Sequence, residues 1–432
     1  YLNGERSGRG KEYYYSGELE FIGEYLNGIR NGNGTEYYNG KPKFWGNYLN
    51  GQKNGKGNEY YDNGKIKFDG EFYKGERRKG KEYNKEGKLL FEGEFYDGIK
   101  RSGKVYDESN NSEYELKNGN GKVKEYHDNG SLKFEGEYLN GKRNGEGKEY
   151  DSNGKLIYEG EYLKGEKSGK GKEYDYNNYN LKYKGEYLNG KRNGLGKEYY
   201  RSGKVKYEGE YLNDKKWTGK IYDESNENVY ELKNGNGKIK EFSDDGKLKY
   251  EGEYLNGERN GKGKEYDYNG KLIYEGEYLN GKRHGKGKEK KYYYDGKLKN
   301  EYEGEFLSGK KSGKGKEYNS DGKLEYEGEF LNGKKSGKGK AYNSCGTLYF
   351  EGEYLNGERN GKGTEYDYWN GKLEFEGEYL NGEKSGKGKE YYDNGKLKYE
   401  GEYKNGKRNG NGKEYNIDGK LSFEGNYING EK

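Results

Sequence analysis

The sequence predicts an all-β protein: an elongated, twisted, single-layer antiparallel meander of about 18 tandem β-hairpins that forms a solenoid-like rod. Three observations support this fold class. One segment recurs along the whole chain, usually every 23 to 25 residues. Within each copy, apolar and charged residues alternate with the period of two that is typical of a half-buried strand. Each full copy also contains an Asn-Gly pair or a close variant, which favours a tight hairpin turn.

One regular copy of the segment begins at Tyr250 and reads YEGEYLNGERNGKGKEYDYNG. Its first predicted strand places Leu248, Tyr250 and Tyr254 on one face and charged residues on the other. The pair at 256–257 then turns the chain into a second strand over residues 261–266. A second Asn-Gly pair leads into the next copy. No sustained helical periodicity competes with this interpretation.

Aromatic residues and glycines at fixed positions are expected to build the array. The glycines either turn the chain or leave space for aromatic rings of neighbouring strands, because a glycine inside a strand otherwise only weakens it. The predicted aromatic stripe includes Tyr250, Tyr254, Tyr274, Tyr278, Phe350 and Tyr354. The predicted structural glycines include Gly252, Gly257, Gly261, Gly263, Gly276, Gly281, Gly285 and Gly287.

The array is predicted to run continuously over residues 1–432 rather than to divide into globular domains. Residues 1–92 hold the least regular copies, and residues 328–432 hold regular ones. Between them, residues 93–208 and 209–327 resemble each other as two five-copy blocks, which indicates an internal duplication.

Each of the two blocks contains one shortened copy. These copies begin at Tyr114 (YELKNGNGKVKEY) and Tyr230 (YELKNGNGKIKEF), and each lacks five residues of the usual GEYLNG segment. Their separation, 230 − 114, is 116 residues. Because the first hairpin turn is shortened at both places, we expect a local kink or narrowing there.

The repeated pattern resembles the MORN repeat (membrane occupation and recognition nexus), whose usual form is Y-x-G-x-W/F-x-x-G-x-x-x-G-x-G. The stretch from Glu390, EYYDNGKLKYEGEYKNGKRNGNGKEYNIDGKL, is also similar to the YwqK-like MORN variant. The resemblance implies a protein that self-associates and organises partners, and the family name implies contact with phosphoinositides. One copy that meets the pattern comprises Tyr274, Gly276, Tyr278, Gly281, Gly285 and Gly287.

Composition narrows the function classes. Only 27% of the 432 residues are hydrophobic and 37% are charged, which is typical of disordered chains, yet 16% are aromatic and 55 are tyrosine. A thin repeated core reconciles these values. The net charge of +5 arises from 83 basic and 78 acidic residues, and this near balance argues against a dedicated nucleic-acid-binding protein.

Residues suited to catalysis are scarce or repetitive. The only histidines are His127 and His284, and the single cysteine, Cys345, has no histidine close in sequence. The Glu-x-Glu pairs recur in every copy, whereas a catalytic pair would be unique. We therefore expect no catalytic residue, cofactor or metal, and no enzymatic activity.

The leading expectation is a structural scaffold or spacer that mediates protein–protein interaction and self-assembly, at the cytoskeleton or cell cortex. One alternative is a peripheral membrane module that binds phosphoinositides, although the sequence has no polybasic cluster. Another is an appendage to an enzyme or toxin–antitoxin system outside this segment, since the chain lacks Met and opens in mid-repeat. A single cysteine favours a reducing, cytoplasmic location with cytoskeletal or membrane association.

The exposed aromatic stripe is the feature expected to drive assembly into dimers or larger species. Contiguous apolar stripes of this length are unusual on monomers. Three arrangements would cover it: the sheet coils so that the stripe lines its own concave interior, two rods pack stripe to stripe, or a partner chain occupies the groove. The glycines beside each ring favour the first arrangement.

Overall fold

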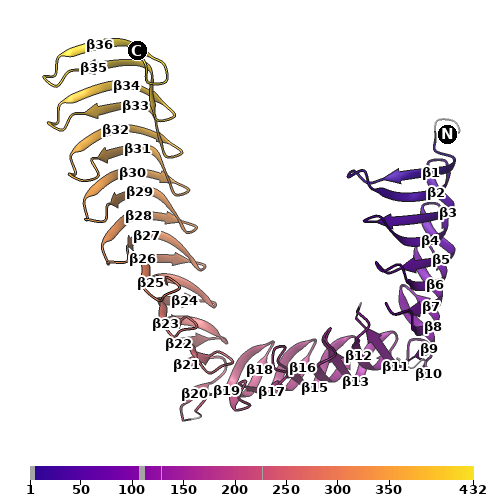
Figure 1. Ribbon diagram of the computed structural model, residues 1–432. Coiled ribbons are helices and arrows are strands. Elements are labelled where there is room, and N and C mark those ends of the chain that lie inside the picture. The colour runs from indigo at the N-terminus through magenta and orange to yellow at the C-terminus, as the bar shows by residue number, and fades with distance from the viewer. Residues whose placement is uncertain (1–4, 107–111, 128, 226) are drawn as a thin grey trace. The chain divides into compact units, whose positions relative to one another are not determined.

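The computed structural model describes residues 5–106, 112–127, 129–225 and 227–432. Its strands follow one another in chain order, and within each sheet every strand pairs with the strands next to it in sequence (Figure 1). Neighbouring strands pair antiparallel, as β22 does with β23 and β23 with β24, so the all-β hairpin prediction is confirmed. The chain forms two units, residues 1–216 and 217–432, called unit 1 and unit 2 below.

Three sheets contain all the strands of the described residues. The first sheet consists of β1 (Gly8–Tyr13), β2 (Leu19–Leu26), β3 (Ile29–Tyr38), β4 (Lys41–Leu49), β5 (Gln52–Tyr60), β6 (Ile66–Tyr73), β7 (Glu76–Tyr83), β8 (Leu89–Tyr96), β9 (Ile99–Tyr106) and β10 (Ser112–Leu116). The second consists of β11 (Gly121–Tyr126), β12 (Leu132–Leu139), β13 (Lys142–Tyr150), β14 (Leu156–Leu163), β15 (Glu166–Tyr174), β16 (Leu181–Leu188), β17 (Lys191–Tyr199), β18 (Val205–Leu212), β19 (Lys215–Tyr222) and β20 (Val229–Leu232).

The third sheet lies within unit 2 and is the longest, with 16 strands. It consists of β21 (Gly237–Phe242), β22 (Leu248–Leu255), β23 (Glu258–Tyr266), β24 (Leu272–Leu279), β25 (Lys282–Tyr292), β26 (Leu298–Leu307), β27 (Lys310–Tyr318), β28 (Leu324–Leu331), β29 (Lys334–Tyr342), β30 (Leu348–Leu355), β31 (Glu358–Tyr366), β32 (Leu373–Leu380), β33 (Glu383–Tyr391), β34 (Leu397–Lys404), β35 (Lys407–Tyr415) and β36 (Leu421–Tyr427).

The meander is divided into three sheets, because strand pairing stops between β10 and β11 and again between β20 and β21. Both interruptions lie inside the shortened copies, where too few residues remain to form a full hairpin. The predicted kink at these places stays a prediction. The division of the chain into residues 1–92, 93–208, 209–327 and 328–432 likewise stays a sequence-based interpretation.

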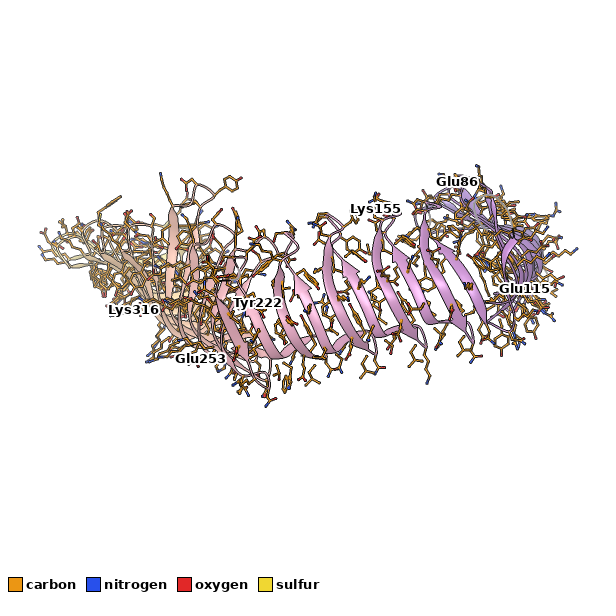
Figure 2. The ribbon with its side chains drawn as sticks, turned by 90° about the horizontal axis from the view of Figure 1, so that it is seen from below. Glu86, Glu115, Lys155, Tyr222, Glu253 and Lys316 are labelled. Atoms are coloured by element: carbon orange, nitrogen blue, oxygen red, sulfur yellow. The ribbon has the colours of Figure 1, made fainter. Side chains whose placement is uncertain are left out.

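The two turns of each copy have different backbone geometries. Between β22 and β23, Asn256 and Gly257 have φ values of 53° and 75°, as a tight hairpin turn of the predicted kind requires. In the second turn only Gly270 has positive φ, at 80°. There the Asp267 carboxylate accepts backbone N–H bonds at 2.8 and 2.9 Å from the second and fourth residues after it. In unit 1, Lys155 follows a second turn and lies where the strands of its sheet end (Figure 2).

The core is a column of aromatic rings that stack edge to face along each sheet. The Tyr278 ring lies between the rings of Tyr250 and Tyr274, with centroid distances of 5.2 and 5.3 Å and interplanar angles of 86° and 87°. Tyr274 then contacts Phe306 of the next copy at 5.1 Å. Edge-to-face contacts suit the ring quadrupole and add to the free energy gained by burial. Each copy is thereby joined to the next.

Pairs of glycines lie beneath the first ring of each copy. Gly252 and Gly263 pair across β22 and β23, and the Tyr250 ring covers both. A Cβ added at Gly263 would lie 2.3 Å from the Tyr250 hydroxyl oxygen and 2.5 Å from a ring carbon. Any side chain larger than hydrogen would therefore displace the ring from the sheet.

A ladder of alternating charges covers the aromatic column on its outer side. The Arg259 guanidinium carbon lies 4.3 Å from the Tyr250 ring centroid, a distance typical of a cation–π contact. The same side chain pairs with Glu241 of the preceding copy at 2.8 Å and with Glu265 of its own copy at 3.4 Å. Glu265 in turn pairs with Arg283 at 2.7 Å. The aromatic face is thus closed by ionic contacts between copies.

Backbone hydrogen bonds join successive first turns, and they continue through the shortened copy. The Gly281 N–H donates to the Arg259 carbonyl at 2.9 Å. At the interruption of unit 2, the Gly235 N–H donates to the Trp217 carbonyl at 2.6 Å, while the Gly235 carbonyl accepts from Gly257 at 2.9 Å. The turns therefore stay connected where strand pairing stops.

Aliphatic side chains replace the aromatic rings at the shortened copies. Ile221, Leu232 and Ile239 are all at least 97% buried in unit 2. Leu232 pairs across the strands with Gly219, and Ile239 with Gly252, whereas Ile221 pairs with Tyr230. The equivalent buried residues of unit 1 lie 116 positions earlier and are Val105, Leu116 and Val123.

Candidate functional site

The predicted aromatic stripe forms the core rather than an exposed surface. Tyr250, Tyr274 and Phe350 are 0% exposed, and Tyr278 and Tyr354 are also buried. Tyr254 is the exception and is only half-buried. It follows the shortened copy, which supplies no ring to stack against it, and its hydroxyl donates to Glu241 instead.

The predicted glycines fall into three groups. Gly252, Gly263, Gly276 and Gly287 lie beneath rings, as expected, and Gly257 and Gly281 take the positive φ of the first turn. For Gly261 the expectation of a neighbouring ring is wrong, and Gly285 occupies the equivalent position in the next copy. Each has positive φ at a β-bulge and faces a glutamate: a Cβ added at Gly261 would lie 2.1 Å from a carboxylate oxygen of Glu253. The sequence gives no distinct sign of this bulge.

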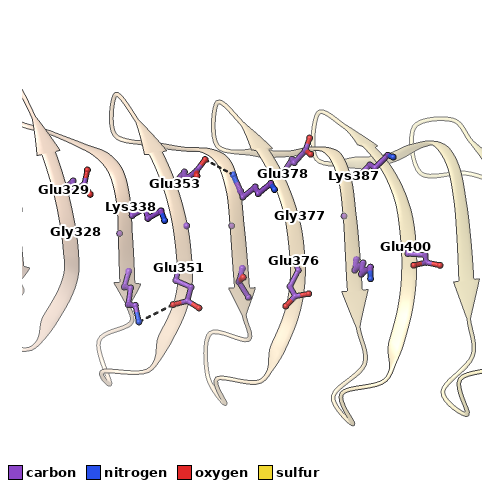
Figure 3. A pocket seen from close by; sticks show the side chains of 18 of the residues that line it. Gly328, Glu329, Lys338, Glu351, Glu353, Glu376, Gly377, Glu378, Lys387 and Glu400 are labelled. Atoms are coloured by element: carbon purple, nitrogen blue, oxygen red, sulfur yellow. Dashed lines mark hydrogen bonds and ion pairs between the residues drawn. The ribbon is translucent and has the colours of Figure 1, made fainter.

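A long groove lies on the other face of the sheet in unit 2, opposite the aromatic rings. It extends from β26 to β36 and has a volume of about 1710 Å³. Its floor consists of paired glycines such as Gly328 and Gly339, and its sides carry ten glutamates and eight lysines (Figure 3). The expectation that the aromatic stripe lines the concave interior is therefore wrong, because charged residues line the hollowed face.

One side of the groove is a row of satisfied ionic and hydrogen-bonded contacts. Lys340 pairs with Glu351 of the next strand at 3.3 Å, and Lys316 pairs with Glu327 at 3.4 Å. The Tyr342 hydroxyl also donates to Glu327 at 2.8 Å. Burial and this hydrogen bond raise the pKa of Tyr342 to about 12. Apart from Lys389, the lysines of this row are already neutralised by glutamates of the chain.

The inner row of lysines differs, because its charges have no such partners. Lys314, Lys338, Lys362 and Lys387 are exposed, and among the described residues none of them forms an ion pair. The neighbouring glutamates instead fold over the bulge glycines, and Glu353 accepts the backbone N–H of Lys362 at 3.2 Å (Figure 3). Their carboxylates are thus held beside the backbone while the lysine side chains remain available.

The sequence alone does not predict this row, because strand alternation places both lysines of each Lys-Gly-Lys segment on the same face. Only the strand register shows that the second lysine faces a glutamate of the next strand with which it pairs, as Lys340 does with Glu351. The first lysine, such as Lys338, faces Glu353, whose equivalents lie over the bulge glycines. The position beside the bulge is therefore the signal that separates the two rows.

Unit 1 contains a smaller and less regular groove of about 1020 Å³. Its paired row is retained: Lys172 contacts Glu159 at 2.7 Å. Its inner row is not, since Glu146 and Leu195 stand where unit 2 has lysine. The groove of unit 2 is therefore the better candidate for a binding site.

The histidine and cysteine residues that could serve in catalysis lie far apart in the sequence. His127 Nε2 lies 2.9 Å from the Tyr150 carbonyl oxygen, and Cys345 is exposed in a second turn. Among residues 5–106, 112–127, 129–225 and 227–432, no cluster of three or more His, Cys, Asp or Glu side chains is suited to a metal ion. In the same part of the chain, no helix is long and apolar enough to cross a membrane.

Comparison with protein families identifies the repeat. The family model described as the MORN repeat matches twelve segments that together cover more than half of the chain: residues 1–18, 21–41, 46–66, 134–155, 158–178, 183–205, 250–271, 274–292, 302–323, 326–342, 350–372 and 399–420. The chain belongs to the MORN repeat family. The MORN repeat variant matches residues 119–140, 235–256 and 384–405, so two of the three variant matches coincide with the shortened copies.

No curated protein matches this MORN chain. Two solved structures show a remote likeness, each at 11% identity and a TM-score of 0.14. One is a mutant Photorhabdus luminescens Tc holotoxin pore, with 98% of this chain and 26% of that chain covered. The other is TcdB2-TccC3 without its hypervariable C-terminal region, with 99% and 25% covered. This chain thus spans about a quarter of their length, and at this TM-score neither likeness carries information on function.

Proposed function

We propose that this MORN array is a non-enzymatic scaffold that binds an extended, acidic segment of a partner protein along the groove of unit 2. The observation that supports this proposal is the row formed by Lys314, Lys338, Lys362 and Lys387. One such lysine recurs in each of four successive hairpins, at intervals of roughly 10 Å, which is two strand spacings, and Asn411 takes the position in the next hairpin. An extended chain with acidic groups at that interval would neutralise the row.

The groove favours a polypeptide over a membrane surface. The lysines rise from a narrow floor of glycines and stand between two rows of glutamates, so a flat anionic surface would meet carboxylates as well as ammonium groups. A single chain can enter the groove and contact the glycine backbone closely. Phosphoinositide binding, cytoskeletal association and a cytoplasmic location remain further proposals that the MORN family suggests.

The test uses the full chain with polyglutamate peptides of increasing length as the probe. Fluorescence anisotropy at fixed salt should show tighter binding as the peptide spans more hairpins. Changing the four inner lysines to Gln should weaken binding at least tenfold. The matched control changes four lysines of the second turns to Gln and should leave binding intact: Lys323, Lys372, Lys396 and Lys420.

Two results would contradict the proposal. Equal affinity of the inner-row variant and the wild type would show that the groove is not the site. Binding to vesicles that contain anionic lipid, with no binding to polyglutamate and with the same dependence on the inner lysines, would favour the membrane alternative.

A further inference from the structure

A row of exposed leucines runs along the first-turn edge of unit 2. Each leucine follows the second aromatic residue of its copy by one position, so its side chain points to the groove face rather than to the core. Between 45% and 57% of each leucine side chain is exposed. Contiguous apolar rows of this kind mark interaction surfaces. The row comprises Leu255, Leu279, Leu307, Leu331, Leu355 and Leu380, followed by Lys404 and Ile428.

Charged residues fill the gaps between the leucines. Leu307 pairs across its turn with Lys310, and Leu355 pairs with Glu358, so apolar and charged side chains alternate from strand to strand about every 4.8 Å. The charged members are, in order, Glu258, Lys282, Lys310, Lys334, Glu358, Glu383 and Lys407. Of these, all but Glu258 are exposed and form no ion pair with the described residues of the chain.

The order of the charges is antisymmetric about its middle member, Lys334. Reversing the row about Lys334 places an opposite charge against each of the six other charged residues named above: Glu258 against Lys407, Lys282 against Glu383, and Lys310 against Glu358. The same reversal places apolar residues together: Leu331 against Leu355, Leu307 against Leu380, and Leu255 against Ile428. Only Leu279 meets a charged residue, Lys404, whose aliphatic stem can cover it.

We propose that this row, called the leucine edge, is a self-association surface on which a second copy of the chain packs antiparallel, with the two-fold axis at Lys334. A two-fold interface brings the same patch of both copies together, so each heterotypic contact forms twice. Two copies have identical strand spacing and the same hand of twist, which keeps the rows in step. The row offers area on the order of the roughly 800 Å² that each partner contributes to a standard interface.

The order of charge signs favours a second copy over another occupant. An unrelated partner needs no antisymmetry about Lys334, whereas a two-fold dimer does. The buried aromatic stripe cannot form the contact between two chains, because its rings are already covered by side chains of the same chain. The leucine edge goes beyond the groove proposal and does not depend on it, since the inner lysines take no part.

Sedimentation velocity of the full chain over a concentration range tests the leucine edge. Lys310→Glu and Glu358→Lys should each weaken dimerisation at least tenfold, because each sets like charges against each other at two places. The double variant should restore it. An equimolar mixture of the two single variants should also form dimers, because the reversed charge at 310 of one copy faces the reversed charge at 358 of the other.

Two further variants address the axis and the apolar contact. Lys334→Gln should strengthen dimerisation, since it removes the one repulsion of the alignment. Leu331→Asp should weaken it at least tenfold. The control, Ile417→Asp, changes an exposed residue of a second turn and should have no effect.

Three results would overturn the proposal: a wild-type chain that stays monomeric at all concentrations, single charge variants that dimerise like the wild type, or a mixture that does not dimerise. Each single variant should still bind polyglutamate as the wild type does. The leucine edge and the groove proposal therefore fail independently.

Discussion

The Arg283 guanidinium carbon lies 4.4 Å from the centre of the Tyr274 ring. The same guanidinium pairs with Glu265 and with Glu289, each at 2.7 Å. One side chain therefore covers a fully buried ring and links the carboxylates of two successive hairpins. Desolvation opposes the charged form of Arg283, but the hydrogen bond to Glu265 and the negative charges of Glu265 and Glu289 together outweigh it, so the pKa of the guanidinium is raised.

We expect Arg283→Gln to destabilise the hairpin formed by β24 and β25 by about 1 to 3 kcal/mol. The change removes the cation–π contact and leaves two partly buried carboxylates without their shared counterion. Hydrogen exchange should show faster opening of residues 272–292, and less change at distant hairpins, because each repeat contacts only its neighbours. Lys286→Gln is the control, since Lys286 is exposed in the same strand. Equal exchange rates in the two variants would contradict the role of the charge ladder.

Gly287 and Gly281 should differ in what they tolerate. A Cβ at Gly287 would lie 2.4 Å from the Tyr274 hydroxyl oxygen and 2.7 Å from ring carbons, so Gly287→Ala should cost about 1 to 3 kcal/mol through displacement of a buried ring. Gly281 has φ of 77° and no atom within 4 Å, so Gly281→Ala should cost about 1 kcal/mol through backbone strain alone. Urea unfolding measures both.

An asparagine at the two positions separates these causes. Gly281→Asn should recover most of the lost stability, because asparagine tolerates the left-handed conformation. Gly287→Asn should be at least as destabilising as Gly287→Ala. A recovery at both positions would show that backbone strain, and not the Tyr274 ring, is the reason for glycine at 287.

Alkaline pH should unfold the array through its tyrosines. Burial and then a hydrogen bond to a glutamate raise the pKa of Tyr342, Tyr366 and Tyr391 to about 12, against a usual value of 10.0. Because the folded pKa is the higher one, this stabilisation is complete below pH 10 and is lost as pH rises from 10 to about 12. Circular dichroism and tyrosinate absorbance should therefore change together in this window. Ionisation of most tyrosines at pH 10 without loss of structure would contradict this expectation.

The hairpins could be predicted because the alternation of the strands and the residues of the first turn are both visible within each copy. Tyr250 and Gly252 share a face by alternation, and the pair at 256–257 marks the turn. The β-bulge at Gly261 could not be predicted, because its glycine looks the same as the one beneath the ring at Gly263. The bulge shifts the register, so it determines the face on which every later residue of the strand lies and the residue with which it pairs.

The arrangement of lysines and glutamates in the groove depends on that bulge. The core residues could therefore be predicted from the sequence more fully than the groove residues. Lys338 and Lys340 are equivalent by alternation, yet only Lys340 meets an available carboxylate, that of Glu351. The buried aromatic stripe shows the same limit in reverse. Five of the six aromatic residues named from the sequence are buried, but alternation does not show that Arg259 covers Tyr250 and pairs with Glu241 of the preceding copy.

The shortened copies offer a last test, because two interpretations of Leu232 predict opposite results. Leu232 occupies the place of the ring-covered glycine of a regular copy, so a degenerate repeat would tolerate Leu232→Gly or be improved by it. The structure instead buries Leu232, as it buries Ile221 and Ile239, and Leu232 stands opposite Gly219. Leu232→Ala should therefore cost about 2 to 5 kcal/mol, and Leu232→Gly still more.

Hydrogen exchange of residues 229–242 would follow this local loss, and Val229→Ala is the matched control. Val229 belongs to the same strand but is 46% exposed, so its truncation should change stability by only about 0.5 kcal/mol. Protection that is unchanged or increased in Leu232→Gly would identify the shortened copy as a decayed repeat. Loss of protection confined to β20, β21 and the turn at Gly235 would show that the shortened copy is a structural junction. In such a junction, aliphatic packing and the hydrogen bonds between turns replace strand pairing.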